Sequence, residues 1–96
     1  GSEMCIETVF IEALAKAGVK NGIPKAKALE IVTQTVLASA NNLLASSQSP
    51  HDFIDAICSP GGTTIAGLLE LERLGLTATV SSAIDKTIDK AKQLQK

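Results

Sequence analysis

Apolar residues recur every three or four positions along most of this chain, which is the spacing of a helix face. The first such stripe consists of Ile6, Val9, Phe10, Ala13, Leu14 and Ala17. It predicts a helix from about Glu3 to Lys20. Asn21-Gly22 follows, and this pair suits a left-handed helix C-cap.

The second predicted helix, from about Pro24 to Ser46, is the longest and is apolar on more than one face. Pro24 suits the first turn, where a missing N–H does no harm. The apolar positions are Leu29, Ile31, Val32, Val36, Leu37, Ala40, Leu43 and Leu44. A helix of this kind is buried on several sides, which a domain of 96 residues hardly achieves alone. The pattern therefore indicates a dimer.

Two shorter helices are predicted next. Ser49-Pro50-His51-Asp52 is typical of a helix start, with serine as N-cap and an acid in the first turn. Phe53, Ile54 and Ile57 are expected to point inward from this helix, which ends near Cys58. A further helix is predicted from Thr63 or Thr64 to about Leu74, with Gly75 as its C-cap.

The last predicted helix begins with Thr77 as a cap and is strongly amphipathic. Its apolar stripe consists of Val80, Ala83, Ile84, Thr87, Ile88, Ala91 and Leu94. No segment alternates with period two, and no internal repeat is visible. The whole chain, residues 1–96, is therefore predicted to be one all-α domain of five helices.

Composition narrows the function classes. Apolar residues make up 45% of the chain and aromatic residues only 2%, so the helices must pack through small and aliphatic side chains. The net charge of −1 argues against nucleic-acid binding. No apolar run is long enough for a membrane span, and the pattern of the sequence leads us to expect no signal peptide. Cys5 and Cys58 have no metal or redox spacing, which favours reduced thiols and a cytoplasmic location.

The sequence gives little support for catalytic or metal-binding side chains. His51 is the only histidine and is interpreted as a surface residue. Glu70 and Glu72 lie two positions apart on a helix and point in different directions. Cys58 has no cationic neighbour that would lower its pKa, and it is interpreted as an inert thiol. We predict no catalytic residue and no metal ligand in this chain.

The segment "SPGGTT", residues 59–64, is the strongest candidate site. Gly61 and Gly62 permit positive φ and close approach of a ligand. They lead into a helix N-terminus, where unpaired N–H groups and the helix dipole favour a carboxylate or phosphate. Thr63 and Thr64 add hydroxyl groups. By pattern alone, a plain corner between two helices remains the stronger interpretation, and an anion site is the alternative.

Three blocks of sequence resemble the C-terminal domain of the pyrroline-5-carboxylate reductase family. They are "FIEALAKAGVKNGIPKAKALEIVTQTVLASANNLL", "SPHDFIDAICSPGGTTIAGLLELE" and "AIDKTIDKAKQL". The resemblance covers about residues 9 to 95, and the spacing between blocks matches. The segments "EALA-AGV--G-P---A" and "SPGGTTIAGL" are each fairly specific.

The resemblance implies much that composition does not show. Members of this family reduce 1-pyrroline-5-carboxylate to L-proline with NAD(P)H. Their C-terminal helical domains interlock as a homodimer, and some form larger rings. The family's "SPGGTT"-like loop binds the substrate carboxylate, which assigns Ser59, Gly62, Thr63 and Thr64 to substrate binding, with Gly61 shaping the loop. Thr64 is the preferred hydroxyl contact.

Two departures leave an alternative open. The family's "GSGPAY"-like entry to the first helix reads "GSEMCIETVF" here, and a common threonine of that helix is Val9. The chain also holds no nucleotide-binding fingerprint, so this part is expected to bind no cofactor itself and to be inactive alone. We expect either a fragment of such a reductase or a divergent stand-alone copy. The alternative function is a non-catalytic helical dimerisation module derived from that fold.

Overall fold

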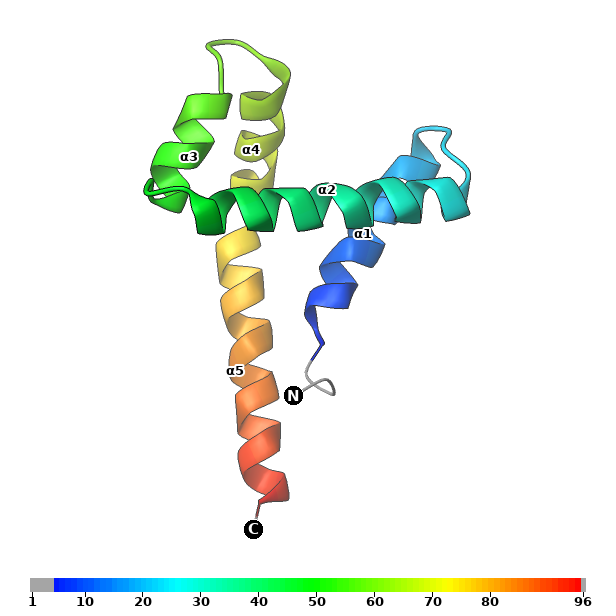
Figure 1. Ribbon diagram of the computed structural model, residues 1–96. Coiled ribbons are helices and arrows are strands. Elements are labelled where there is room, and N and C mark those ends of the chain that lie inside the picture. Colours follow the sequence, from blue (N-terminus) through cyan, green and yellow to red (C-terminus); the bar gives the residue numbers. More distant parts are fainter. Residues whose placement is uncertain (1–4, 96) are drawn as a thin grey trace. The chain divides into compact units, whose positions relative to one another are not determined.

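The computed structural model describes residues 5–95, and in this part of the chain the regular structure consists of five helices without strands (Figure 1). Their bounds are α1 Glu7–Lys20, α2 Lys25–Ala45, α3 Pro50–Ile57, α4 Thr63–Arg73 and α5 Leu76–Leu94. The prediction of an all-α domain with five helices is confirmed. No helix in residues 5–95 is both long and apolar enough to cross a membrane.

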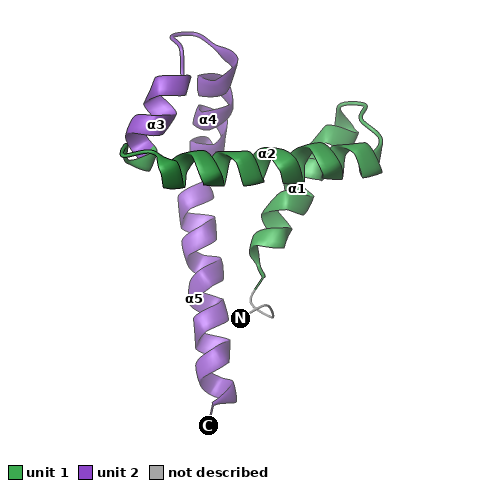
Figure 2. Cartoon of the chain, viewed as in Figure 1, with its two compact units in different colours: residues 1–50 green, residues 51–96 purple. Residues whose placement is uncertain are grey.

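The chain divides into two compact units, residues 1–50 and 51–96 (Figure 2). The first unit contains α1 and α2, and the second contains α4, α5 and nearly all of α3. Each unit is described by itself below.

The first unit is a helical hairpin with a tight connection. Gly22 adopts φ +99°, as its prediction as a left-handed C-cap requires, while Asn21 stays at negative φ. The Gly22 N–H donates to the Val19 carbonyl over 3.0 Å, and the Ile23 N–H donates to the Gly18 carbonyl over 3.0 Å. This pair of hydrogen bonds is a Schellman motif, and it satisfies carbonyl groups left over at the end of α1.

The two ends of this hairpin differ slightly from the prediction. Pro24 is the N-cap of α2 and not its first helical residue; its carbonyl accepts the Ala28 N–H at 2.9 Å. At the other end, the predicted start of the first helix at Glu3 lies outside the described residues. Cys5 and Ile6 lie before α1, which begins at Glu7.

The contact between α1 and α2 is made by very small residues. Ala15 and Ala28 are 0% and 1% exposed. A Cβ placed on Gly18 would lie only 3.2 Å from the Ala28 Cβ, so the two helices pack almost backbone to backbone here. Lys25 Nζ and Glu12 Oε1 lie 2.8 Å apart and add an ion pair between the helices. Ala15 lies outside the apolar stripe that predicted this helix.

The second unit turns between α4 and α5 at a single glycine. Gly75 has φ +83° and serves as the N-cap of α5, and its carbonyl accepts the Thr79 N–H at 2.9 Å. The prediction that Thr77 caps this helix is wrong, because the left-handed glycine lets α5 begin at Leu76 and Thr77 already lies in its first turn. The predicted starts of the two preceding helices, at Pro50 and at Thr63, are confirmed.

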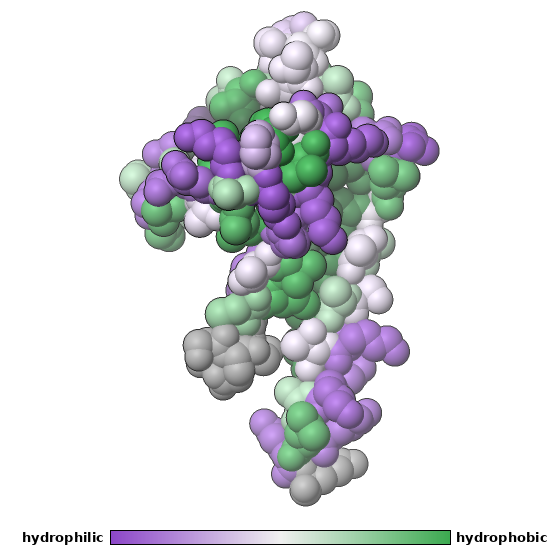
Figure 3. Space-filling view, turned by 90° about the vertical axis from the view of Figure 1, so that its right-hand side faces the viewer, coloured by the Kyte–Doolittle hydropathy of each residue, from purple (hydrophilic) through white to green (hydrophobic). Residues whose placement is uncertain are grey.

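Large apolar side chains lie exposed on all five helices. The inward orientation expected of Ile57 is not found in the single chain, where this residue is 56% exposed. Figure 3 shows apolar residues open at the surface beside strongly polar ones. The exposed residues are Val9, Phe10, Leu14, Val19, Ile23, Leu29, Ile31, Leu37, Leu43, Leu44, Ile57, Leu69, Leu71, Leu74, Leu76, Ile84, Ile88 and Leu94. In one copy, much of the apolar surface of residues 5–95 therefore remains exposed.

Candidate functional site

The loop between α3 and α4 is a type II β-turn. The Gly62 N–H donates to the Ser59 carbonyl over 3.0 Å, Pro60 occupies the second position and Gly61 has φ +70°. Proline presets φ at that second position, and the third position of a type II turn requires positive φ. The sequence Ser-Pro-Gly-Gly therefore specifies this turn, and the interpretation of Gly61 as a loop-shaping residue agrees with its geometry.

Helix α4 starts directly after this turn without a side-chain cap. Gly62 is the N-cap in an extended conformation, with φ −82° and ψ −179°, and its carbonyl accepts the Ala66 N–H at 3.4 Å. Gly62 makes no side-chain cap hydrogen bond to the first turn of α4. The N–H groups of Thr63, Thr64 and Ile65 are the first three of α4, so the helix offers them no carbonyl partner.

These groups form one small electropositive site. Thr63 and Thr64 are exposed, so their hydroxyl groups are open to solvent beside the free N–H groups. The helix dipole adds the equivalent of about half a positive charge at this end. Ser59, Gly61 and Gly62 of the predicted set lie in the turn, and Thr63 and Thr64 form the start of α4. The backbone N–H of Ile65 is an additional donor, which the side chain of an isoleucine gave no reason to predict.

Gly62 also lies against Ser59. A Cβ on Gly62 would overlap the Ser59 Oγ and lie 3.2 Å from the Ser59 carbonyl oxygen. Gly62 itself is at negative φ, so its backbone does not demand glycine. A side chain at this position would instead require the Ser59 side chain and carbonyl group to shift.

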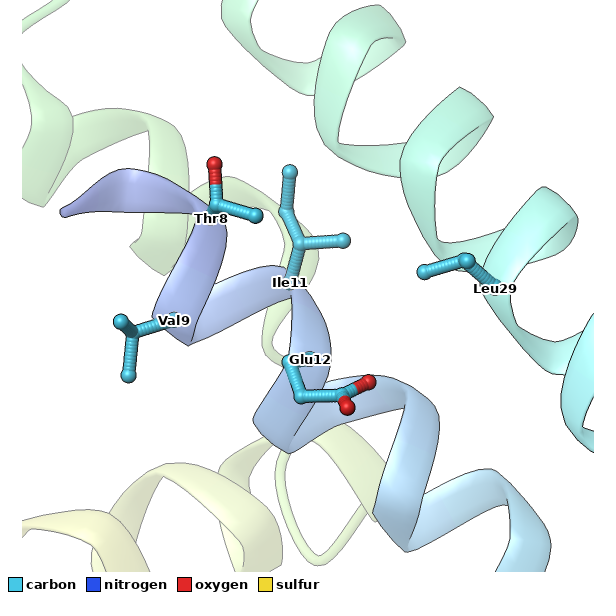
Figure 4. A pocket seen from close by; sticks show the side chains of 5 residues that line it. All are labelled: Thr8, Val9, Ile11, Glu12 and Leu29. Atoms are coloured by element: carbon cyan, nitrogen blue, oxygen red, sulfur yellow. The ribbon is translucent and has the colours of Figure 1, made fainter. Parts of the chain in front are cut away.

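A separate cavity of about 420 Å³ lies between α1 and α2 (Figure 4). In Figure 4, Ile11 and Leu29 project into the space between the two helices. The cavity is lined by Thr8, Val9, Ile11, Glu12 and Leu29. The Glu12 carboxylate accepts a hydrogen bond from Lys25, and this bond lowers the pKa of Glu12. The acid is therefore held ionised and is poorly suited to donate a proton.

In the second unit, a cavity of about 310 Å³ lies between α3, α4 and the start of α5. It is lined by His51, Ile54, Asp55, Leu68, Leu71, Glu72, Leu76 and Thr77. His51 is exposed, as its interpretation as a surface residue predicted. Within residues 5–95 no group of three potential metal-ligating residues comes together. Nearby on α4, Arg73 hydrogen-bonds Glu70 over 2.7 Å and lowers the pKa of that carboxyl group.

Comparison with known proteins gives the same family over nearly the whole chain. The family model "Pyrroline-5-carboxylate reductase dimerisation" matches residues 1–94. The chain is 40% identical over its full length to the pyrroline-5-carboxylate reductase of Escherichia coli K12, covering 36% of that protein. It is 44% identical over 95% of its length to pyrroline-5-carboxylate reductase 3 of Xenopus laevis, covering 33% of that protein.

Solved structures agree in fold. A 1-pyrroline-5-carboxylate reductase from Streptococcus pyogenes matches 97% of this chain with a TM-score of 0.90 and 87% identity. The pyrroline carboxylate reductase of Plasmodium falciparum, solved with NADP bound, matches 93% with a TM-score of 0.85 and 36% identity. The chain spans 36% and 34% of these two proteins. On the family match over residues 1–94, this chain belongs to the pyrroline-5-carboxylate reductase dimerisation family.

Proposed function

We propose that this chain is the dimerisation and substrate-binding part of a pyrroline-5-carboxylate reductase. The reaction is reduction of 1-pyrroline-5-carboxylate to L-proline by hydride transfer from NAD(P)H to the imine carbon. Support comes from the family match over residues 1–94 and from the NADP-bound relative. The nicotinamide cofactor supplies the hydride, and the residues of this chain hold and orient the substrate.

The uncapped start of α4 carries this proposal. A substrate carboxylate needs several convergent donors, and the N–H groups of Thr63, Thr64 and Ile65 point out of the same helix end without helix partners. The hydroxyl group of Thr64 is the side-chain donor assigned to the carboxylate. Such preorganised donors cost little reorganisation when the anion binds.

Homodimerisation is the second part of the proposed function. The exposed apolar residues on all five helices give each copy a large surface to cover with another copy. A dimer is the smallest assembly that does this, and a larger ring built from dimers is compatible with it. We propose no nucleic-acid or membrane partner, and the cytoplasmic location remains a prediction from the two widely spaced cysteines.

Thr64→Val in the full-length reductase tests the carboxylate site. Valine keeps the volume and removes the hydroxyl donor. The KM for 1-pyrroline-5-carboxylate should rise roughly tenfold or more, since a hydrogen bond to a charged group contributes about 1.5–3 kcal/mol. Thr79→Val, on an exposed position of α5, is the matched control and should leave the KM unchanged. An unaltered KM in Thr64→Val would remove this hydroxyl group from the site.

The alternative, a non-catalytic dimerisation module, is supported by one observation. Val9 stands where the family commonly has a threonine, and its side chain is 62% exposed on α1. The reading frame upstream of this chain separates the two functions. A nucleotide-binding domain with the GxGxxG fingerprint there supports the reductase, and a frame without it supports the module.

A further inference from the structure

We draw no further inference here: the strongest candidate, the cavity of about 310 Å³ between α3, α4 and the start of α5, lies among apolar side chains that a second copy of the chain is already proposed to cover, and nothing in the described residues 5–95 shows what else would occupy it.

Discussion

The two units of the chain differ in how far their helices bury residues against each other. In the first, α1 and α2 meet at Ala15, Gly18 and Ala28, and an ion pair between Glu12 and Lys25 links the helices. In the second, none of the described residues 51–95 is buried to the extent of those two alanines. The longest helix of that unit, α5, leaves Ile84, Ile88 and other apolar residues open.

The difference indicates where the single chain is sufficient and where a second copy is needed. Small residues let two helices approach closely enough for good packing within one chain. In the second unit several large apolar residues, among them Leu69, Leu74 and Ile88, stay exposed, and burying each large one contributes about 1.5–3 kcal/mol. We therefore expect the α1–α2 contact to depend little on dimerisation, and α5 to depend on it strongly.

The largest effect is expected from a charge placed on the apolar stripe of α5. Ile88→Glu removes an aliphatic side chain and adds a carboxylate at a position that is 44% exposed in one copy. In a symmetric dimer the change occurs twice. The dimer dissociation constant should rise about a hundredfold or more, measured by analytical ultracentrifugation over a range of concentrations.

Lys90→Glu is the matched control for this change. It introduces the same carboxylate two residues further along α5, outside the apolar stripe. It should leave the dissociation constant nearly unaltered. If Ile88→Glu stays as dimeric as this control, the α5 stripe is not part of the dimer interface.

The helices were predicted well because two kinds of local signal in the sequence agree on where they end. Apolar periodicity gave their extent, and Gly22 and Gly75 marked turns that require positive φ. The packing was harder to predict. Ala15 carries a weak hydropathy signal, yet it is buried, while Val9 and Leu14 of the predicted stripe are 62% and 51% exposed. The spacing of apolar residues along a helix identifies its apolar face but does not indicate which other helix covers that face.

The candidate site was predictable to the same local extent. The role of Gly61 in the turn could be predicted because glycine adopts positive φ easily. The helix start at Thr63 could be predicted because the preceding Pro-Gly-Gly interrupts the helical pattern. The contact of Ser59 with Gly62 could not, because it arises only when the turn folds the chain back on itself. The N–H of Ile65 was missed for another reason: it belongs to the backbone, and an isoleucine side chain gives no sign of an unpaired backbone donor.

Substituting one glycine within a helix of each unit tests the difference between the units, with a smaller expected effect on the free energy of unfolding. Gly67 on α4 has no atom within 4 Å of an added Cβ, whereas Gly18 on α1 would meet the Ala28 Cβ at 3.2 Å. Gly67→Ala should raise the free energy of unfolding by about 1 kcal/mol through helix propensity. Gly18→Ala gains the same propensity but crowds Ala28, so its net effect should be near zero or destabilising.

Urea unfolding of both variants at one protein concentration measures this difference. Equal stabilisation by both would show that the α1–α2 contact is looser than the structure indicates. Destabilisation by Gly67→Ala would contradict the open surroundings of this residue in one copy, and it would place α4 in close contact with a second copy.

The smallest effect is expected from the ion pair that joins α1 and α2. The hydrogen bond from Lys25 holds the pKa of Glu12 below its usual range, so folding favours the ionised carboxylate. This contribution is present above the unfolded pKa of about 4.3 and is lost as the pH falls through the lower folded pKa. Glu12→Gln should therefore lower the thermal midpoint slightly near neutral pH and have less effect near about pH 3.

Glu70→Gln is the control in the second unit. It removes an ion pair between two residues of the same helix turn, so this pair does not connect one helix to another. Both side chains of the Glu12 pair are well exposed, so added salt should reduce the difference. A loss of midpoint that is equal at both pH values would assign the effect to side-chain packing and leave the α1–α2 contact to Ala15, Gly18 and Ala28 alone.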